Sequence, residues 1–250
     1  MTTLAPPRRR GRSGLRGPAG SKTTWLRRPL APSCRYRPRC ERTVPFLRDI
    51  ASSPAVDVIA IGASAGGLQP LRTIAAGLPP DFAADVLVVL HVAATGTSVL
   101  PRILGRVCSL EVLRGADGIE LGHGRVIVAP PDRHLLVQGG HVVLGRGPRE
   151  NGHRPAIDPL MRSAAATYGA RACGVVVSGT RDDGTLGLAE IKRAGGIALV
   201  QDPDEAEYPS MPANAMAATA VDAALPVDEI AAVLTELARA TVANGQEAPE

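Results

Sequence analysis

The sequence predicts an α/β fold: a doubly wound, mostly parallel sheet with helices on both faces and an antiparallel β-hairpin edge in its middle section. Three observations favour this fold. Short apolar runs alternate with segments of helical period, as in strand–helix–strand units. The runs are apolar throughout, which is typical of strands buried on both faces. Apolar residues make up 45% of the 250 residues but aromatic residues only 2%, so Val, Leu, Ile and Ala must build the core.

The first half of the fold begins with the apolar run Val58–Ile61, which predicts a buried strand. A glycine-rich turn at 62–67 follows, and then a helix over 68–76. The second strand is expected at Val86–His91 and a short helix over 98–104. This order implies parallel strands joined by right-handed crossovers.

The middle section contains four short strand candidates, at 110–113, 125–129, 134–138 and 141–144. Gly139-Gly140 between the last two is a two-residue hairpin signal. We expect this section to be a β-rich insertion or an antiparallel edge, and not a separate domain.

The alternation of strands and helices then resumes. Asp158 is interpreted as an N-cap with Pro159 at the first helical position, and Gly169 ends that helix after Tyr168. A third buried strand is expected at Gly174–Ser178. The remaining elements are a helix ending near 193, a strand at 196–200, a helix at 213–219 and an amphipathic helix at 228–242.

The charges divide the chain into a basic leader and an acidic remainder. Residues 1–50 contain 13 Lys and Arg against 2 acids (+11), and residues 51–250 contain 15 against 22 (−7), which together give +4. We expect a disordered Pro- and Arg-rich leader at 1–52, an α/β domain at 53–242 and a flexible tail at 243–250. A solvated tail or a start codon assigned too early explains the leader better than contact with nucleic acid or an anionic membrane.

The four cysteines indicate a reduced protein. No C-x-x-C pair and no zinc spacing occurs among Cys34, Cys40, Cys108 and Cys173. They are interpreted as thiols of a cytoplasmic protein without a metal, with Cys173 in a buried strand. No apolar stretch of about 18 residues is present, so no transmembrane segment is expected.

Three polar side chains follow three apolar strands: Ser64, His91 and Asp183 (or Asp182). Open parallel sheets bind ligands at this edge, so these residues are expected to converge there. A serine, a histidine and a carboxylate in one place supply a nucleophile, a general base and a group that orients the base. Each residue alone is a weak signal, and only their joint placement indicates a hydrolase.

Two other enzyme classes match the glycine turn less well. Residues 62–66 fit the G-x-S-x-G elbow of α/β-hydrolases, but that class needs the order serine, acid, histidine, and the last histidine, His153, precedes the third strand. A dinucleotide-binding oxidoreductase of the short-chain type needs Tyr-x-x-x-Lys, and Tyr168 is followed at that spacing by Ala172. A P-loop lacks its G-K-[ST].

Several other charged residues remain ambiguous. Arg149, His153 and Arg154 lie in one loop. We favour the interpretation that this loop is solvated over the alternative that its side chains line the site and contact an acidic helix. His134 and His141 are interpreted as structural.

From about Val56 to Leu237 the chain resembles the catalytic domain of the chemotaxis protein-glutamate methylesterase (CheB-type) family. Six segments in the same order carry the resemblance: Ile61–Gly67, the strand ending in His91, Val128–Leu135, Arg154–Asp158, Ser178–Gly184, and Gln201-Asp202 followed by Ser210-Met211-Pro212.

The resemblance implies that Ser64 is the nucleophile, His91 the base and Asp183 the orienting acid. It also implies that Ala65 and Thr180 position the substrate through an oxyanion hole. The reaction would be hydrolysis of glutamate γ-methyl esters on receptor proteins to glutamate and methanol, with glutamine deamidation as a side activity. No metal or organic cofactor is implied.

The partners implied are a methylated chemoreceptor or another methylated signalling protein, and also a methyltransferase or a separate response regulator. Nucleic acid is not expected as a partner. Family members usually carry an N-terminal receiver domain, for which the 50-residue leader is too short, so we expect no built-in phosphoryl control.

Two departures from the family pattern leave an alternative open. Ala65 stands where threonine is frequent, and Thr180-Arg181 stand where Met-Gly is frequent. The alternative function is a catalytically weak or inactive methylesterase-like interaction module in a signalling pathway.

Overall fold

In the computed structural model of this protein, residues 54–92 and 98–239 are described. The leader predicted at 1–52 and the tail predicted at 243–250 lie outside the described residues, and so do Cys34 and Cys40. The domain boundaries therefore stay predictions.

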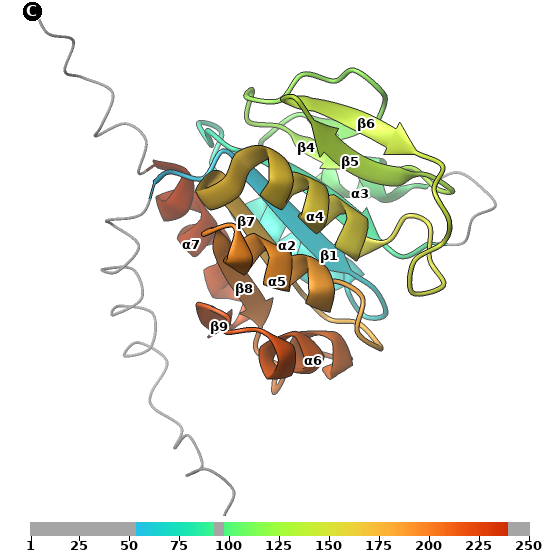
Figure 1. Cartoon of the computed structure of the whole chain (residues 1–250). Coiled ribbons are helices and arrows are strands. Elements are labelled where there is room, and N and C mark those ends of the chain that lie inside the picture. The colour runs from blue at the N-terminus through green and yellow to red at the C-terminus, as the bar shows by residue number, and fades with distance from the viewer. Residues whose placement is uncertain (1–53, 93–97, 240–250) are drawn as a thin grey trace, which may run out of the picture. The chain divides into compact units, whose positions relative to one another are not determined.

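Seven parallel strands form the main sheet in the order β3-β4-β2-β1-β7-β8-β9 (Figure 1). Their bounds are β1 Val58–Ala63, β2 Asp85–Leu90, β3 Val112–Arg114, β4 Val126–Val128, β7 Ala172–Val176, β8 Ile197–Gln201 and β9 Ala223–Leu225. A separate antiparallel pair consists of β5 His134–Gln138 and β6 His141–Gly145. The predicted fold class is confirmed.

Helices cover both faces of the main sheet. The bounds are α2 Leu68–Gly77, α3 Leu100–Leu104, α4 Ile157–Tyr168, α5 Thr185–Arg193, α6 Ser210–Ala218 and α7 Val227–Arg239, with a 3-10 turn, η1, at Gly169–Arg171. In Figure 1, α4 and α5 lie in front of β1 and β7, while α2 and α7 lie behind the sheet. Two apolar layers result. One contains α2, α3 and α7, and the other contains α4, α5, α6 and the β5–β6 hairpin.

The strands are apolar throughout because each of them faces both layers. In β1, Ile59 and Ile61 pack with the α2–α7 layer, while Val58 and Ala60 pack with the α4–α5 layer. Side chains alternate between faces with a period of two, so a strand buried on both faces has no polar side. This explains why the buried strands are the best-predicted elements.

The middle section differs in part from its prediction. The hairpin at Gly139-Gly140 is confirmed between β5 and β6. The two earlier candidates, at 110–113 and 125–129, instead become β3 and β4, which extend the main sheet in parallel beside β2. They are therefore not part of an antiparallel edge.

The N-cap prediction for the helix at 158 is wrong. Ala156 is the N-cap of α4, and Asp158 is the second residue of the helix. The reason is that the acceptor for the first amides of α4 comes from another loop, as described below. The end of this helix after Tyr168, with Gly169 as C-cap, is confirmed.

The topology brings three strand ends together at one edge. β1 lies between β2 and β7, so the chain runs to one side of β1 first and then crosses to the other. The carboxyl ends of strands on either side of such a switch point form the usual ligand site of open α/β sheets.

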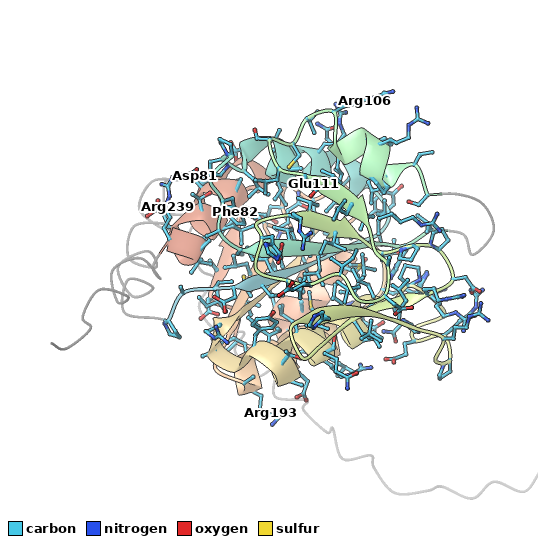
Figure 2. The ribbon with its side chains drawn as sticks, turned by 90° about the horizontal axis from the view of Figure 1, so that it is seen from above. Asp81, Phe82, Arg106, Glu111, Arg193 and Arg239 are labelled. Atoms are coloured by element: carbon cyan, nitrogen blue, oxygen red, sulfur yellow. The ribbon has the colours of Figure 1, made fainter. Side chains whose placement is uncertain are left out.

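Away from that edge, Asp81 precedes the amino end of β2 and lies beside Arg239 of α7, 3.7 Å from its guanidinium (Figure 2).

Among the described helices, none is long and apolar enough to span a bilayer.

Candidate active site

Ser64 follows β1 in a turn that is tied to the end of β7. The Ser64 N–H donates to the carbonyl of Ser178 at 3.0 Å, and the Ser64 carbonyl accepts from Gly67 at 3.0 Å. A β-carbon on Gly179 would lie 2.9 Å from the Ser64 β-carbon and would collide with the Met211 sulfur. Glycine at 179 therefore lets the end of β7 approach the serine turn closely.

His91 joins Ser64 to Asp183. Its Nδ1 lies 2.9 Å from the Ser64 hydroxyl and its Nε2 lies 2.6 Å from Asp183 Oδ2. The His91 side chain is 5% exposed and that of Asp183 2%. The predicted convergence of these three residues is thus observed. Asp182, the alternative acid, is exposed, and its carbonyl accepts from Thr185.

The carboxylate of Asp183 is held by the start of α4. The N–H groups of Ile157 and Asp158 donate to it at 2.8 and 3.1 Å. These are the first two amides of the helix, which have no acceptor within the helix itself. The positive end of the helix dipole also favours a negative charge here. Asn151 adds a third donor, at 2.9 Å from Asp183 Oδ1.

Asp158 forms the matching cap on α5. Its buried carboxylate accepts from the N–H of Gly184 at 3.0 Å and of Gly187 at 2.7 Å, at the start of α5. The Asn151 amide that contacts Asp183 also donates to Asp158 Oδ2 at 2.9 Å. Asn151 and the cap formed by Asp158 were missed from the sequence, because their partners lie 7 to 32 residues away.

The two carboxylates differ in their pKa shifts. Burial raises the pKa of Asp183, but hydrogen bonds from His91, Ile157 and Asn151 outweigh that effect and lower the pKa to about 2. Burial is the largest cause at Asp158, and together with the charge of Asp183 it raises the pKa above the usual value. Asp183 is therefore the ionised partner of His91 at neutral pH.

The ionised Asp183 fixes the tautomer of His91. A carboxylate only accepts hydrogen bonds, so the proton of a neutral His91 ring belongs on Nε2. The lone pair on Nδ1 then faces the Ser64 hydroxyl. This is the state that a general base needs.

His153 stacks on the imidazole ring of His91. The His153 and His91 rings are parallel within 3° and their centroids are 3.6 Å apart. Burial lowers the pKa of His153, and the positive charge that His91 carries when protonated lowers it further. The loop is closed by two backbone hydrogen bonds between Glu150 and His153. The expectation of a solvated loop is therefore wrong for His153.

The other two charged residues of that loop have different surroundings. Arg154 donates to Asp132 at 2.7 Å and to the carbonyl of Gly147 at 2.8 Å, which makes it a structural residue. Arg149 is exposed. His134 supports the same loop, since its ring contacts the carbonyl of Pro148 and the N–H of Ala156.

Ala65 follows Ser64 in the turn after β1, and Thr180 follows Gly179 in the loop after β7. The Ala65 carbonyl accepts from the Ser178 hydroxyl at 2.9 Å, which itself accepts from Tyr208 N–H at 3.0 Å. Within the part of the chain that is described, neither the Ala65 nor the Thr180 N–H is bonded to an acceptor. Their predicted role toward an oxyanion stays a prediction.

Over residues 54–92 and 98–239, no group of three or more His, Cys, Asp and Glu side chains is arranged to hold a metal ion. Cys173 is buried in β7, as predicted, and burial raises its pKa.

Comparison with known proteins identifies the family. The model of the CheB methylesterase family matches residues 59–234. A protein-glutamate methylesterase/protein-glutamine glutaminase of Anaeromyxobacter dehalogenans is 43% identical over 77% of this chain, which spans 57% of that relative. A putative protein of the same name from Leptospira interrogans is 37% identical over 72% of this chain and 94% of its own length.

A solved structure agrees with both sequence comparisons. The catalytic domain of CheB methylesterase from Thermotoga maritima has a TM-score of 0.69 and 32% identity, and covers 73% of this chain and 99% of that domain. The matched region includes residues from every strand of the main sheet and all of Ser64, His91 and Asp183, and this chain belongs to the CheB methylesterase family.

Proposed function

We propose that this protein is a serine hydrolase that converts glutamate γ-methyl esters on a receptor protein to glutamate and methanol, and that also deamidates glutamine. The observation that carries this proposal is the chain of hydrogen bonds from the Ser64 hydroxyl through His91 to Asp183. The names of the relatives from Anaeromyxobacter and Leptospira describe this reaction for those proteins. The departures at Ala65 and Thr180 leave the three side chains in bonding contact, which argues against an inactive module.

In the first half of the reaction, the Ser64 oxygen attacks the ester carbonyl carbon while His91 Nδ1 takes the hydroxyl proton. The imidazolium donates from Nε2 to Asp183, whose charge stabilises it. The N–H groups of Ala65 and Thr180 hold the oxyanion. The carbon–methoxy bond then breaks, and His91 passes its proton to the methoxy oxygen, so that methanol leaves and an acyl-serine remains.

In the second half, water attacks the acyl carbon and His91 takes one of its protons. The bond to the Ser64 oxygen breaks, and the proton returns to that oxygen. The product is the glutamate side chain. With glutamine as substrate, ammonia leaves in the first half instead of methanol. Each proton in this sequence moves through His91.

The substrate that we propose is a methylated chemoreceptor or a related methylated signalling protein, with a methyltransferase and a response regulator as pathway partners. We place the reaction in the cytoplasm, where free thiols such as those of Cys108 and Cys173 persist.

The test is methanol release from receptor membranes that carry labelled methyl groups. Ser64→Ala should release methanol at least about 10³-fold more slowly than the wild type. Ser109→Ala, which changes an exposed serine elsewhere, is the matched control. Equal rates for the wild type and Ser64→Ala would refute the proposal, and binding of the receptor without turnover would favour the inactive module.

A further inference from the structure

Two arginines from separate loops approach Gly152, the residue before His153. Arg181 lies in the loop between β7 and α5, and Arg149 lies in the loop before α4. The positive charges of both lower the pKa of His153, after the larger effects of burial and of His91. The Arg181 Nη1 atom lies 3.9 Å from the place that a β-carbon on Gly152 would occupy. Arg181 therefore reaches across to the loop that carries Arg149.

Among the described residues, neither guanidinium forms an ion pair, and the Asp132 carboxylate, whose charge acts on Arg149, is already paired with Arg154. Neighbouring arginines are engaged: Arg154 with Asp132 at 2.7 Å and Arg162 with Glu150 at 2.7 Å. By contrast, the ion pairs found in the described ranges include neither Arg149 nor Arg181, and both residues are exposed. Arg149 reaches the Gly152 carbonyl only at 3.5 Å. Both side chains are therefore available to an anion.

The backbone of Arg181 is held in an unusual conformation. Its φ is +70°, in the left-handed region that residues with a β-carbon rarely adopt. The Asn214 side chain fixes this turn by donating to the Arg181 carbonyl at 2.7 Å. Strain of this kind persists mainly at functional sites, where the surroundings hold it in place. A long cationic side chain stands here, two residues before Asp183.

We propose that Arg149 and Arg181 form a carboxylate-binding site that recognises acidic residues flanking the methyl ester on the substrate. This inference rests on the proposed function and extends it, because it specifies that the substrate carries negative charge beside the ester. The ester is neutral, so charge recognition must act on its neighbours. A guanidinium group can bind a carboxylate with two parallel hydrogen bonds, so two such groups suit acidic side chains beside the ester.

The experiment compares two helical peptides that contain one γ-methyl glutamate, flanked either by glutamates or by alanines. The quantity measured is the ratio of kcat/KM for the acidic peptide to that for the alanine peptide. Arg149→Gln and Arg181→Gly should each lower this ratio about three- to fivefold, and the double variant about tenfold, mainly through KM. Arg181→Gly suits the left-handed backbone and so keeps the loop folded.

Two control variants and a change of salt concentration make the result specific. Arg181→Lys keeps the charge but not the paired N–H donors of the guanidinium, so its ratio should lie between those of Arg181→Gly and the wild type. Arg106→Gln removes an exposed arginine at the edge of the molecule (Figure 2) and should leave the ratio unchanged. Added salt should lower the ratio for the wild type but little for the double variant. An equal loss on both peptides, or no loss on either, would overturn the inference.

A binding measurement separates this inference from the proposed function. The affinity of both peptides is measured for Ser64→Ala, with and without the arginine substitutions. If the wild type releases no methanol but the acidic peptide binds through Arg149 and Arg181, the reaction is wrong and the carboxylate site stands. If the wild type turns over both peptides without any preference for the acidic one, the reaction stands and the carboxylate site is wrong.

Discussion

Asp183, which precedes α5, caps the start of α4, and Asp158, which lies in α4, caps the start of α5. Four backbone N–H groups donate to the two carboxylates, at distances from 2.7 to 3.1 Å, and the amide of Asn151 donates to both. The acid that contacts His91 is thus fixed by the same hydrogen bonds that join the two helices. Helix capping and the orientation of the proposed base depend on each other.

Replacement of Asp158 tests this reciprocal capping. Asp158→Ala leaves the N–H groups of Gly184 and Gly187 buried without an acceptor, so we expect the free energy of unfolding to fall by about 2–4 kcal/mol. We expect kcat to fall about 10- to 100-fold, because Asp183 loses its alignment. Asp158→Asn keeps one acceptor oxygen and should cost less in both measurements, which are urea unfolding and methanol release.

Asp204→Ala serves as the control, since that carboxylate is exposed. Equal losses for Asp158→Ala and Asp158→Asn would mean that the acceptor oxygen of Asp158 does not matter.

The pKa of Asp183 predicts a dependence of stability on pH. This pKa is about 2 in the folded protein, against an ordinary value of 3.8. A carboxyl group with a lowered pKa adds stability above its unfolded pKa and loses that contribution as the pH falls through the folded value. The destabilisation caused by Asp183→Asn should therefore be larger at pH 6 than at pH 2.5.

Both proteins in this comparison carry Asp158→Asn, so that the opposite shift of Asp158 does not contribute. The measurement is urea unfolding at several pH values. A destabilisation by Asp183→Asn that is independent of pH would contradict the shift.

His153 should affect the rate through its ring and through its neutrality. His153→Ala removes a ring stacked 3.6 Å from His91, and we expect kcat/KM to fall about three- to tenfold. His153→Phe keeps a planar neutral ring and should retain most of the activity. His153→Lys places a positive charge beside His91, which disfavours the imidazolium, so the acid limb of the pH–rate profile should move to lower pH.

The control for these variants is His141→Ala, which changes an exposed histidine bonded to its own turn. If Phe and Ala at position 153 gave the same rate and Lys left the pH profile unmoved, the stack would have no part in the reaction.

Gly62 tests how closely the sheet and α4 must approach each other. A β-carbon at Gly62 would collide with the side chain of Ile157, the first residue of α4, whose N–H holds Asp183. Gly62→Ala should lower the free energy of unfolding by about 1–3 kcal/mol and should also reduce kcat, because α4 is displaced. Gly62→Ala combined with Ile157→Ala should recover part of the kcat lost by Gly62→Ala alone. Additive losses would show that the collision is not the cause.

The sequence predicted the elements whose identity depends on local pattern. The apolar run at Val58–Ile61 sufficed for β1, and Ser64, His91 and Asp183 could be placed because each follows a buried strand. The strand Ala223–Leu225 was missed, since two alanines and one leucine carry no strand period. The parallel pairing of β3 and β4 was also missed, because strands of three residues do not reveal their partners.

The supporting residues of the site depend on contacts that the local sequence does not specify. Asp158 matched the pattern of an N-cap, but its carboxylate oxygens serve α5 and not its own helix. His153 lies in a polar loop that has no period, and its stack on His91 depends on how that loop closes.

Ser64, His91 and Asp183 follow three adjacent strands, β1, β2 and β7, that are paired residue by residue. Neighbouring strands lie about 4.8 Å apart, so the backbone ladder itself sets the span from the imidazole loop to the acid loop. The distances among these three side chains are therefore set largely by main-chain geometry. The sequences of surface loops can therefore change to bind new substrates while the strand spacing keeps these distances the same.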